Sequence, residues 1–408
     1  MSHHFLSRYL CKIIAAIALV SSAVFMVACG SSSSGMNSGA GNTGSGSGNP
    51  APGGYAAGVG GAGQSGSAQF LVAIQVPGGV PLAATINSTG MLTSATVTTN
   101  HHTEFNPMAI NGAIDPTGTF FYEAVWPGIW AFTINRQNGN LTEMSTSPYD
   151  DTVNFDSVAV DQLGKFVYGY AGSQVYAYSI QAGTGQLSAV SGSPYAADAS
   201  GQQFEVASDR IAISQDDKYL YLATSVGIDA FSIDSTTGSL TKVSGSPFGA
   251  SAGIAFAIST PASGFLYETT TGQSTPISGY SIDSSTGALA PLPSASSPSC
   301  SASNLSSPAS GKFLFGASCG MFQIDSNSGA LTLLSSDPLA PYDGWSDFDP
   351  ASGFLWIVNS PQPCFDCDVG TTTFQVDPNT GSLTMVPNSF FLMQNTQVGD
   401  IQAVAVTH

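Results

Sequence analysis

Short apolar runs, each bounded by turn residues, follow one another along most of the chain. In the clearest example the runs cover residues 211–214, 219–222 and 228–233, and a fourth run, 240–243, follows a turn that ends at Gly238. Runs this short, rich in β-branched and aromatic residues, predict four consecutive antiparallel β-strands. Gly238 can supply the positive φ that a tight turn between such strands needs.

The same turn glycine recurs through the chain at intervals of 42 to 53 residues, at Gly90, Gly139, Gly185, Gly238, Gly287, Gly329 and Gly381. A four-stranded repeat of this length is typical of a β-propeller blade. The first unit, residues 70–98, supplies three strands, and the C-terminal run 401–406 offers the fourth. We therefore predict an all-β, seven-bladed β-propeller with four antiparallel strands per blade, closed by the C-terminal strand pairing with the N-terminal blade.

The N-terminus departs from this pattern. Arg8 and Lys12 precede an apolar run of 14 residues, 13–26, which is shorter than a membrane span of about 20 residues. This arrangement is typical of a secretory signal peptide. The run ends in Val27-Ala28-Cys29, which resembles the lipobox of bacterial lipoproteins. The resemblance implies cleavage before Cys29 and lipid attachment to its sulfur; the alternative is an ordinary signal with a chance cysteine.

Three parts follow from these patterns: a signal peptide over 1–28, a lipidated Cys29 with a flexible Gly- and Ser-rich tether over 29–67, and a propeller over 68–408. We expect export and anchoring to a membrane of the bacterial cell envelope through Cys29. Gly30 after the lipidated cysteine favours the outer membrane, in a cell that has one.

Composition narrows the possible partners. Only 8% of the 408 residues are charged, with 8 Lys plus Arg against 26 Asp plus Glu. Such a chain is not a disordered polyelectrolyte or a charged helical bundle. After loss of residues 1–28 it keeps 6 basic and 26 acidic residues, a formal charge of −20. Nucleic acid is therefore excluded as a partner, because phosphate binding needs a cationic surface.

Short phrases in the repeats resemble a known family. Tyr178-Ser179-Ile180, Phe231-Ser232-Ile233-Asp234 and Tyr280-Ser281-Ile282-Asp283 each precede a Thr-Gly turn, and such units end in Ser-Pro. These phrases are similar to those of the seven-bladed lactonase propellers, which include 6-phosphogluconolactonase-like enzymes. The resemblance implies a carboxylic ester hydrolase that opens lactones. The His-x-His and Asp-Leu-Gly-x-Asp phrases of active members are absent from residues 156–160 and 168–173.

Catalytic candidates lie where loops enter the inner strands, the face on which propellers usually bind ligands. A histidine beside a carboxylate can act as a general base on a lactone or on water, and His101, His102 and Glu104 offer that pair. Glu205 and Arg210 form a second group, in which the arginine suits a carboxylate or oxyanion. The alternatives are solvated loop residues for the first group and an ion pair with Asp209 or Glu205 for Arg210.

Binding candidates are two acids and two tryptophans. Glu123 and Glu268 both follow a tyrosine at a second-strand position that is small or apolar in other repeats, which predicts burial and an altered pKa. Trp126 and Trp345 fall near loops and could form a platform for a sugar or another flat ligand. The alternatives are hydrogen bonding within a blade for the acids and a core position for the tryptophans.

Four cysteines, Cys300, Cys319, Cys364 and Cys367, remain beside the lipidated Cys29 in an exported chain. Their even number in an oxidising compartment predicts disulfides, and strand pairing favours a Cys300–Cys319 bridge. We expect no metal, because adjacent histidines in a strand point to opposite sides, and no cofactor.

Two functions remain from these observations. The sequence favours a binding or scaffold module that holds a protein or glycan partner on one face of the propeller, because the family's catalytic phrases are missing. The alternative is hydrolysis of a non-phosphorylated lactone, because only six basic residues remain to bind a phosphate.

Overall fold

The chain divides into two units, residues 1–51 and 52–408, and all residues described below belong to the second. The computed structural model describes residues 69–76, 81–99, 108–198, 210–249, 255–261, 264–270, 277–292, 304–308, 310–338, 343–349, 353–359, 369–394 and 400–406. The predicted signal peptide, Cys29 and the tether lie outside these residues. No helix occurs among the described residues, and none of them forms a helical span long and apolar enough to cross a membrane.

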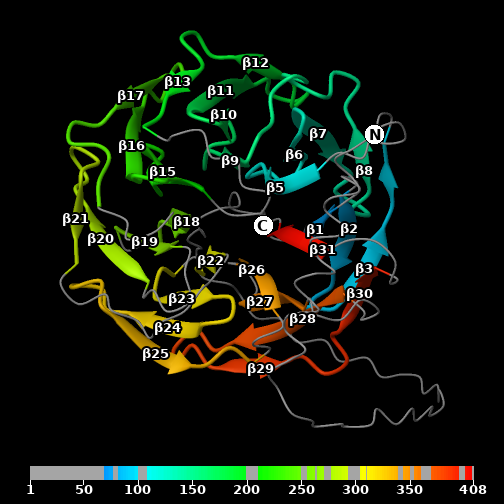
Figure 1. Ribbon diagram of the computed structural model, residues 1–408. Helices are drawn as coiled ribbons and strands as arrows, with labels where there is room; N and C mark the ends of the chain where they lie inside the picture. Colours follow the sequence, from blue (N-terminus) through cyan, green and yellow to red (C-terminus); the bar gives the residue numbers. More distant parts are fainter. Residues whose placement is uncertain are drawn as a thin grey trace, which may run out of the picture. The chain divides into compact units, whose positions relative to one another are not determined.

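Seven antiparallel sheets radiate around a common centre, which confirms the predicted all-β seven-bladed propeller (Figure 1). From the inner strand outwards, blade 1 consists of β31 (Asp400–Val406), β1 (Gln69–Val76), β2 (Leu82–Ile86) and β3 (Leu92–Ala95). Blade 2 consists of β5 (Met108–Ile114), β6 (Phe120–Trp126), β7 (Ile129–Ile134) and β8 (Leu141–Glu143). Blade 3 consists of β9 (Ser157–Val160), β10 (Phe166–Ala171), β11 (Gln174–Ile180) and β12 (Leu187–Ala189).

The second half of the ring repeats this order. Blade 4 consists of β14 (Ile211–Ile213), β15 (Tyr219–Thr224), β16 (Gly227–Ile233) and β17 (Leu240–Lys242). Blade 5 consists of β18 (Ala255–Ser259), β19 (Phe265–Thr270), β20 (Ser278–Ile282) and β21 (Leu289–Pro291). Blade 6 consists of β22 (Leu305–Ser306), β23 (Phe313–Gly316), β24 (Gly320–Ile324) and β25 (Leu331–Ser335). Blade 7 consists of β26 (Asp343–Asp349), β27 (Phe354–Asn359), β28 (Val369–Val376) and β29 (Leu383–Met385).

Three blades carry an additional strand that the sequence pattern did not predict. β13 (Tyr195–Ala196) pairs with β11, and β30 (Phe391–Gln394) pairs with β28. The predicted outer strand of blade 1 splits, and its end β4 (Val97–Thr98) runs parallel to β8 of blade 2. The split occurs because Thr96 forms hydrogen bonds to blade 2. The Thr96 amide donates to Oδ1 of Asn140, and the Thr96 carbonyl accepts from the amide of Leu141.

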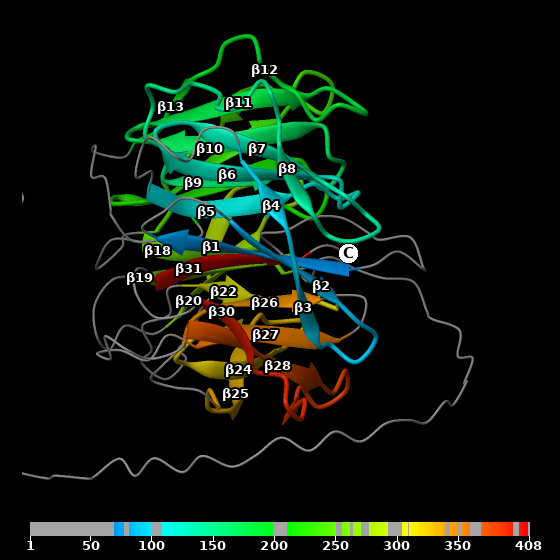
Figure 2. The same ribbon diagram turned by 90° about the vertical axis from the view of Figure 1, so that its right-hand side faces the viewer.

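The first and last parts of the described chain meet in blade 1. β31 pairs antiparallel with β1 from Leu71–Val406 to Val76–Asp400, and the two strands lie side by side in Figure 2. Blades 7 and 1 also share a hydrophobic cluster that contains Phe70 and Trp356. The same cluster extends to blade 2, and five further clusters fill the remaining spaces between neighbouring blades, so the core is divided among the blade interfaces.

Each repeated glycine packs against an aromatic ring of the preceding blade. All seven have φ between 68° and 80°, as their turns require. A Cβ on Gly238 would lie 2.4 Å from Phe166, the first residue of β10. The equivalent pairs around the ring are Gly90–Phe354, Gly139–Phe70, Gly185–Phe120, Gly287–Tyr219, Gly329–Phe265 and Gly381–Phe313. Each glycine therefore meets two requirements. It adopts the positive φ of its turn, and it allows the close approach of an aromatic ring of the preceding blade.

A hydrogen bond accompanies this contact at five of the seven interfaces. In blades 2 to 5 a buried tyrosine of the second strand donates its hydroxyl to the carbonyl of the next blade's turn glycine. The pairs are Tyr122–Gly185, Tyr168–Gly238, Tyr221–Gly287 and Tyr267–Gly329, at 2.8 to 3.1 Å. Between blades 7 and 1 Thr373 Oγ1 donates to Gly90 over 2.9 Å.

A serine near the end of four repeats, followed by proline in blades 2, 3 and 4 and by Phe390 in blade 7, has a structural role as well. In blades 2, 3, 4 and 7 a serine after the outer strand accepts a hydrogen bond from a third-strand amide 16 residues earlier. The serines are Ser147, Ser193, Ser246 and Ser389, at 2.9 to 3.2 Å. The serine thus satisfies an amide that the short outer strand does not reach.

Candidate functional site

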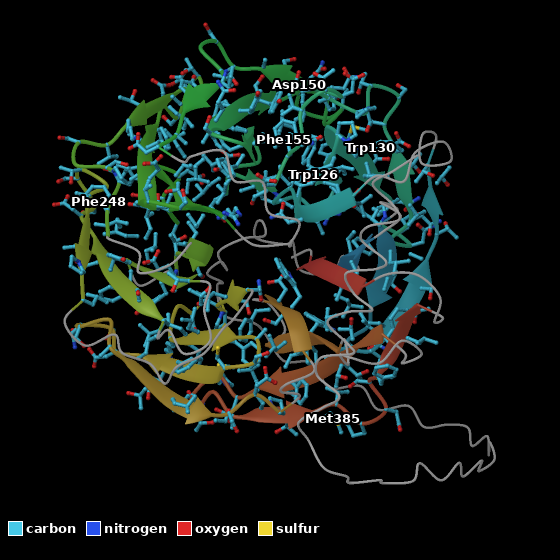
Figure 3. The ribbon with its side chains drawn as sticks, viewed as in Figure 1. Trp126, Trp130, Asp150, Phe155, Phe248 and Met385 are labelled. Atoms are coloured by element: carbon cyan, nitrogen blue, oxygen red, sulfur yellow. The ribbon has the colours of Figure 1, made fainter. Side chains whose placement is uncertain are left out.

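Four side chains from three blades gather at the end of the blades where the inner strands begin and the second strands end. We call this end the entry face, and we call the opposite end of the blades the turn face. Asp156 immediately precedes β9, and Arg210 immediately precedes β14. Trp126 is the last residue of β6, and Tyr170 lies near the end of β10. Trp126 lies nearer the middle of the ring than Asp150 does (Figure 3).

Asp156 is the titratable group at the centre of this arrangement. Its side chain is 2% exposed, and burial raises its pKa from 3.8 to about 6. The charge of Arg210 opposes that rise most, followed by the indole N–H of Trp126 and the amide of Gly172. Neither carboxylate oxygen accepts a hydrogen bond of good geometry from the described residues. The carboxylate therefore stays available as a proton acceptor near neutral pH.

Arg210 is also 2% exposed, and burial lowers its pKa while Asp156 and Tyr170 oppose that effect. A guanidinium nevertheless remains charged at any physiological pH. Tyr170 donates its hydroxyl to the carbonyl of Gly172 over 2.7 Å, which holds the loop whose amide faces Asp156. Burial raises the pKa of Tyr170 to about 12, so it stays a neutral donor.

A second buried acid supports this cluster from blade 4. Asp229, in β16, is fully buried and close enough to Tyr170 for its charge to raise the tyrosine pKa. It accepts hydrogen bonds from the amide of Asp198 at 2.6 Å and from Ser246 Oγ at 3.2 Å, and Lys242 Nζ lies 3.3 Å away. The buried charge of Asp229 is thus compensated by hydrogen bonds and by Lys242. The Asp156 carboxylate, in contrast, accepts no hydrogen bond of good geometry from the described residues.

The cluster combines a buried carboxylate whose pKa is raised to about 6, a fixed cation and N–H donors. Such a set can take a proton from water and stabilise negative charge that develops on a carbonyl oxygen. The described residues contain no group of three or more His, Cys, Asp or Glu side chains that could hold a metal ion.

The structure brings together two of the side chains singled out from the sequence, Arg210 and Trp126. The catalytic candidates His101, His102, Glu104 and Glu205 lie outside the described residues, so their roles stay predictions. Asp156 and Tyr170 were missed, although Asp156 carries a detectable signal: in a chain poor in charge, it stands where an inner strand begins, as Arg210 does.

The other binding candidates, Glu123, Glu268 and Trp345, lie in the core. The sequence offered a core position as the alternative for the tryptophans and hydrogen bonding within the blade as the alternative for the acids. Glu123 is fully buried, and burial, followed by the charge of Glu143, raises its pKa well above the ordinary value. Glu268 is buried and accepts a 2.7 Å hydrogen bond from Tyr280 of its own blade. Trp345 is 3% exposed in the cluster between blades 7 and 1. The two acids are buried and have raised pKa values, as the sequence predicts. Ligand binding by the three residues stays a prediction.

Of the cysteines, only Cys319 is among the described residues, in the turn between β23 and β24, and it is disulfide-bonded. Cys300, Cys364, Cys367 and Cys29 lie outside them. The Cys300–Cys319 pairing and the lipidation therefore stay predictions.

Comparison with known proteins identifies the fold group. Residues 166–302, which include Tyr170 and Arg210, match the family model described as lactonase, 7-bladed β-propeller. The resemblance to the seven-bladed lactonase propellers, which the sequence predicted, is thereby confirmed. No curated protein matches the sequence.

Solved structures of the same fold cover the whole propeller. A periplasmic gluconolactonase from Pseudomonas aeruginosa shares 16% identity at a TM-score of 0.61, over 84% of this chain and 99% of that one. Candidate 6-phosphogluconolactonases from Bacteroides fragilis and Bacteroides uniformis share 17% and 15% identity, each at a TM-score of 0.62 with the same coverage. At identities of 15% to 17%, these structures show that the fold is shared.

Proposed function

We propose that this chain is a lactone hydrolase that opens a non-phosphorylated lactone on the entry face of blades 2 to 4. The observation that carries the proposal is the buried Asp156 with a pKa of about 6, beside the charge of Arg210. The match of residues 166–302 to the lactonase family supports the reaction class.

In this mechanism the Asp156 carboxylate takes a proton from water as the water oxygen attacks the lactone carbonyl carbon. The carbonyl oxygen becomes an oxyanion, which Arg210 and the indole N–H of Trp126 stabilise. The ring C–O bond then breaks, and the proton on Asp156 passes to the leaving alkoxide. The product is a hydroxy acid, whose carboxylate again faces Arg210.

The distribution of cations argues against a phosphorylated substrate. All six basic residues after Cys29 are described, and four of them lie in turns of the turn face: Arg136, Lys165, Lys218 and Lys312. Lys242 is paired with Asp198 at 2.6 Å and with Asp229. Arg210 is thus the one basic side chain of the cluster, whereas a phosphoryl group is usually held by several charge-assisted bonds.

We also propose that the enzyme acts outside the cytoplasm, anchored to the cell envelope through a lipid on Cys29. The apolar run 13–26 and the sequence before Cys29 support export and anchoring. One protein of the same fold, from Pseudomonas aeruginosa, is periplasmic. A sugar lactone without phosphate is the kind of substrate that fits such a location.

The test uses the full chain, expressed with its own signal, and D-glucono-1,5-lactone and its 6-phosphate as substrates. We expect turnover of the neutral lactone, a loss of roughly 100-fold or more in Asp156→Asn, and a comparable loss in Arg210→Met. Arg136→Met is the matched control, because Arg136 lies in an outer turn of blade 2. Full activity in folded Asp156→Asn, or faster hydrolysis of the phosphorylated lactone, would overturn the proposal. His102→Ala tests the histidine candidate in the same assay.

A further inference from the structure

The outer strand of blade 6 differs from every other described outer strand. β25 has five residues, whereas the outer strands of the other blades have three or four. Its pairing with β24 shifts register, because Met321 faces Ser335 and Phe322 faces Leu333, which leaves Leu334 as an extra residue. The other six outer strands pair with their third strands without a shift. A bulge of this kind re-aims side chains.

The bulge changes how blade 6 covers its neighbour. In blade 2 the residue after the outer strand, Met144, contacts the next turn glycine and is 8% exposed. Val190 and Val243 follow the outer strands of blades 3 and 4 and are 7% and 8% exposed. Leu334 makes the corresponding contact with Gly381 of blade 7, yet it remains 39% exposed. The contact is kept, but the space over it stays open.

That space is a cavity of about 310 Å³ between the outer edges of blades 6 and 7, where β25 and β29 are neighbours (Figure 1). It is lined by Leu334, Ser335, Ser336, Pro338, Thr380, Ser382 and Leu383. Its size lies at the lower end of the range of roughly 300–1,000 Å³ for small-molecule sites. The entry-face cluster lies on blades 2 to 4, so this cavity is a separate feature.

Hydroxyl groups and apolar surface alternate in the lining, and none of its residues carries a charge. Ser336, Thr380 and Ser382 are the exposed hydroxyl-bearing residues of the lining. Thr380 Oγ1 donates to Ser382 Oγ over 3.0 Å, which leaves the Ser382 hydroxyl proton to serve another acceptor.

We propose that this cavity is a second binding site, which takes a neutral sugar residue on the outer rim of the propeller. Sugar hydroxyls both donate and accept, which matches the exposed hydroxyls of Ser336 and Ser382. The C–H face of a sugar ring matches Leu334, Leu383 and Pro338. The uncharged lining excludes a phosphate or a carboxylate ligand, because either would lose hydration without a compensating charge. The site would hold a glycan at a distance from the hydrolytic cluster.

The experiment is calorimetric titration of the full chain with three neutral probes, maltotriose, N,N′-diacetylchitobiose and galactobiose. We expect at least one to bind with a Kd of about 1 mM or tighter. Ser336→Ala, which removes an exposed hydroxyl of the lining, and Ser382→Leu, which fills the cavity, should each weaken that binding at least tenfold. Ser239→Leu is the matched control, since Ser239 follows the turn glycine of blade 4 as Ser382 follows that of blade 7.

Each outcome decides the matter. Retained binding in Ser239→Leu together with loss in the two cavity variants supports the site. No binding by any probe up to about 10 mM, or binding that both cavity variants keep, overturns it. Urea unfolding of every variant verifies that lost binding is not lost folding. Lactone hydrolysis is measured separately, so failure of the rim site and failure of the proposed reaction remain distinguishable.

Discussion

Replacing Gly238 with alanine tests the contact on which the ring of blades depends. The φ of Gly238 is +75°, and an added Cβ would lie 2.4 Å from Phe166 Cδ1 and 2.5 Å from Cε1. A left-handed backbone costs an alanine about 1–2 kcal/mol, and overpacking a fixed aromatic contact adds about 1–3 kcal/mol. Reduced entropy of the unfolded chain offsets about 0.4–1 kcal/mol. The expected net loss is therefore about 1–5 kcal/mol, with a middle value of about 3 kcal/mol.

Gly183→Ala separates the two effects. Gly183 has a similar φ, +79°, and lies in the turn region between β11 and β12, but a Cβ added to it would meet no heavy atom within 4 Å. It should lose only about 1 kcal/mol, the backbone part alone. Urea unfolding followed by tryptophan fluorescence measures both variants, with an unchanged m-value as the sign of two-state behaviour. Equal losses in the two variants would refute the argument that the glycines are needed for close approach between blades.

Three further predictions follow. For Asp156, kcat/KM for lactone hydrolysis should rise with pH around 6, because the base acts when ionised, and a profile flat from pH 5 to 8 would contradict that role. Tyr168→Phe should lower stability in urea by about 1 kcal/mol, because the carbonyl of Gly238 loses its buried donor. The pKa of Glu123 is higher in the folded state, so the native protein holds a proton that the unfolded chain releases, and stability falls as pH rises above about 4.5. Glu123→Gln should reduce the slope of that fall by up to about 1.4 kcal/mol per pH unit, as measured in thermal melts from pH 4 to 8.

The fold was readable from the sequence because the signals that specify it are local. Each blade carries its own apolar runs and its own turn glycine, as Gly238 and the strands around it illustrate. The role of that glycine at the neighbouring blade was not readable, since Phe166 lies 72 residues earlier in the chain. The turn requirement alone explained its recurrence, and the packing requirement appeared only with the structure.

The site was less readable, because its chemistry depends on neighbours from different blades. Arg210 and Trp126 drew notice as rare residue types near loops, but Asp156 had no motif around it. Burial raises its pKa, and Arg210, Trp126 and Gly172, which belong to three different blades, lower it in part. Residue spacing along the chain contains little information about such a balance.

The contacts between turn glycines and aromatic rings all lie at the turn face, because the third strands end and the second strands begin there. These particular contacts between one blade and the next are therefore at the far end of the strands from Asp156 and Arg210. Mutations on the entry face can therefore accumulate without disturbing the contacts between the turn glycines and the aromatic rings. In directed evolution, this chain should accept new loop sequences at the entry face more readily than a fold whose site and core contacts coincide.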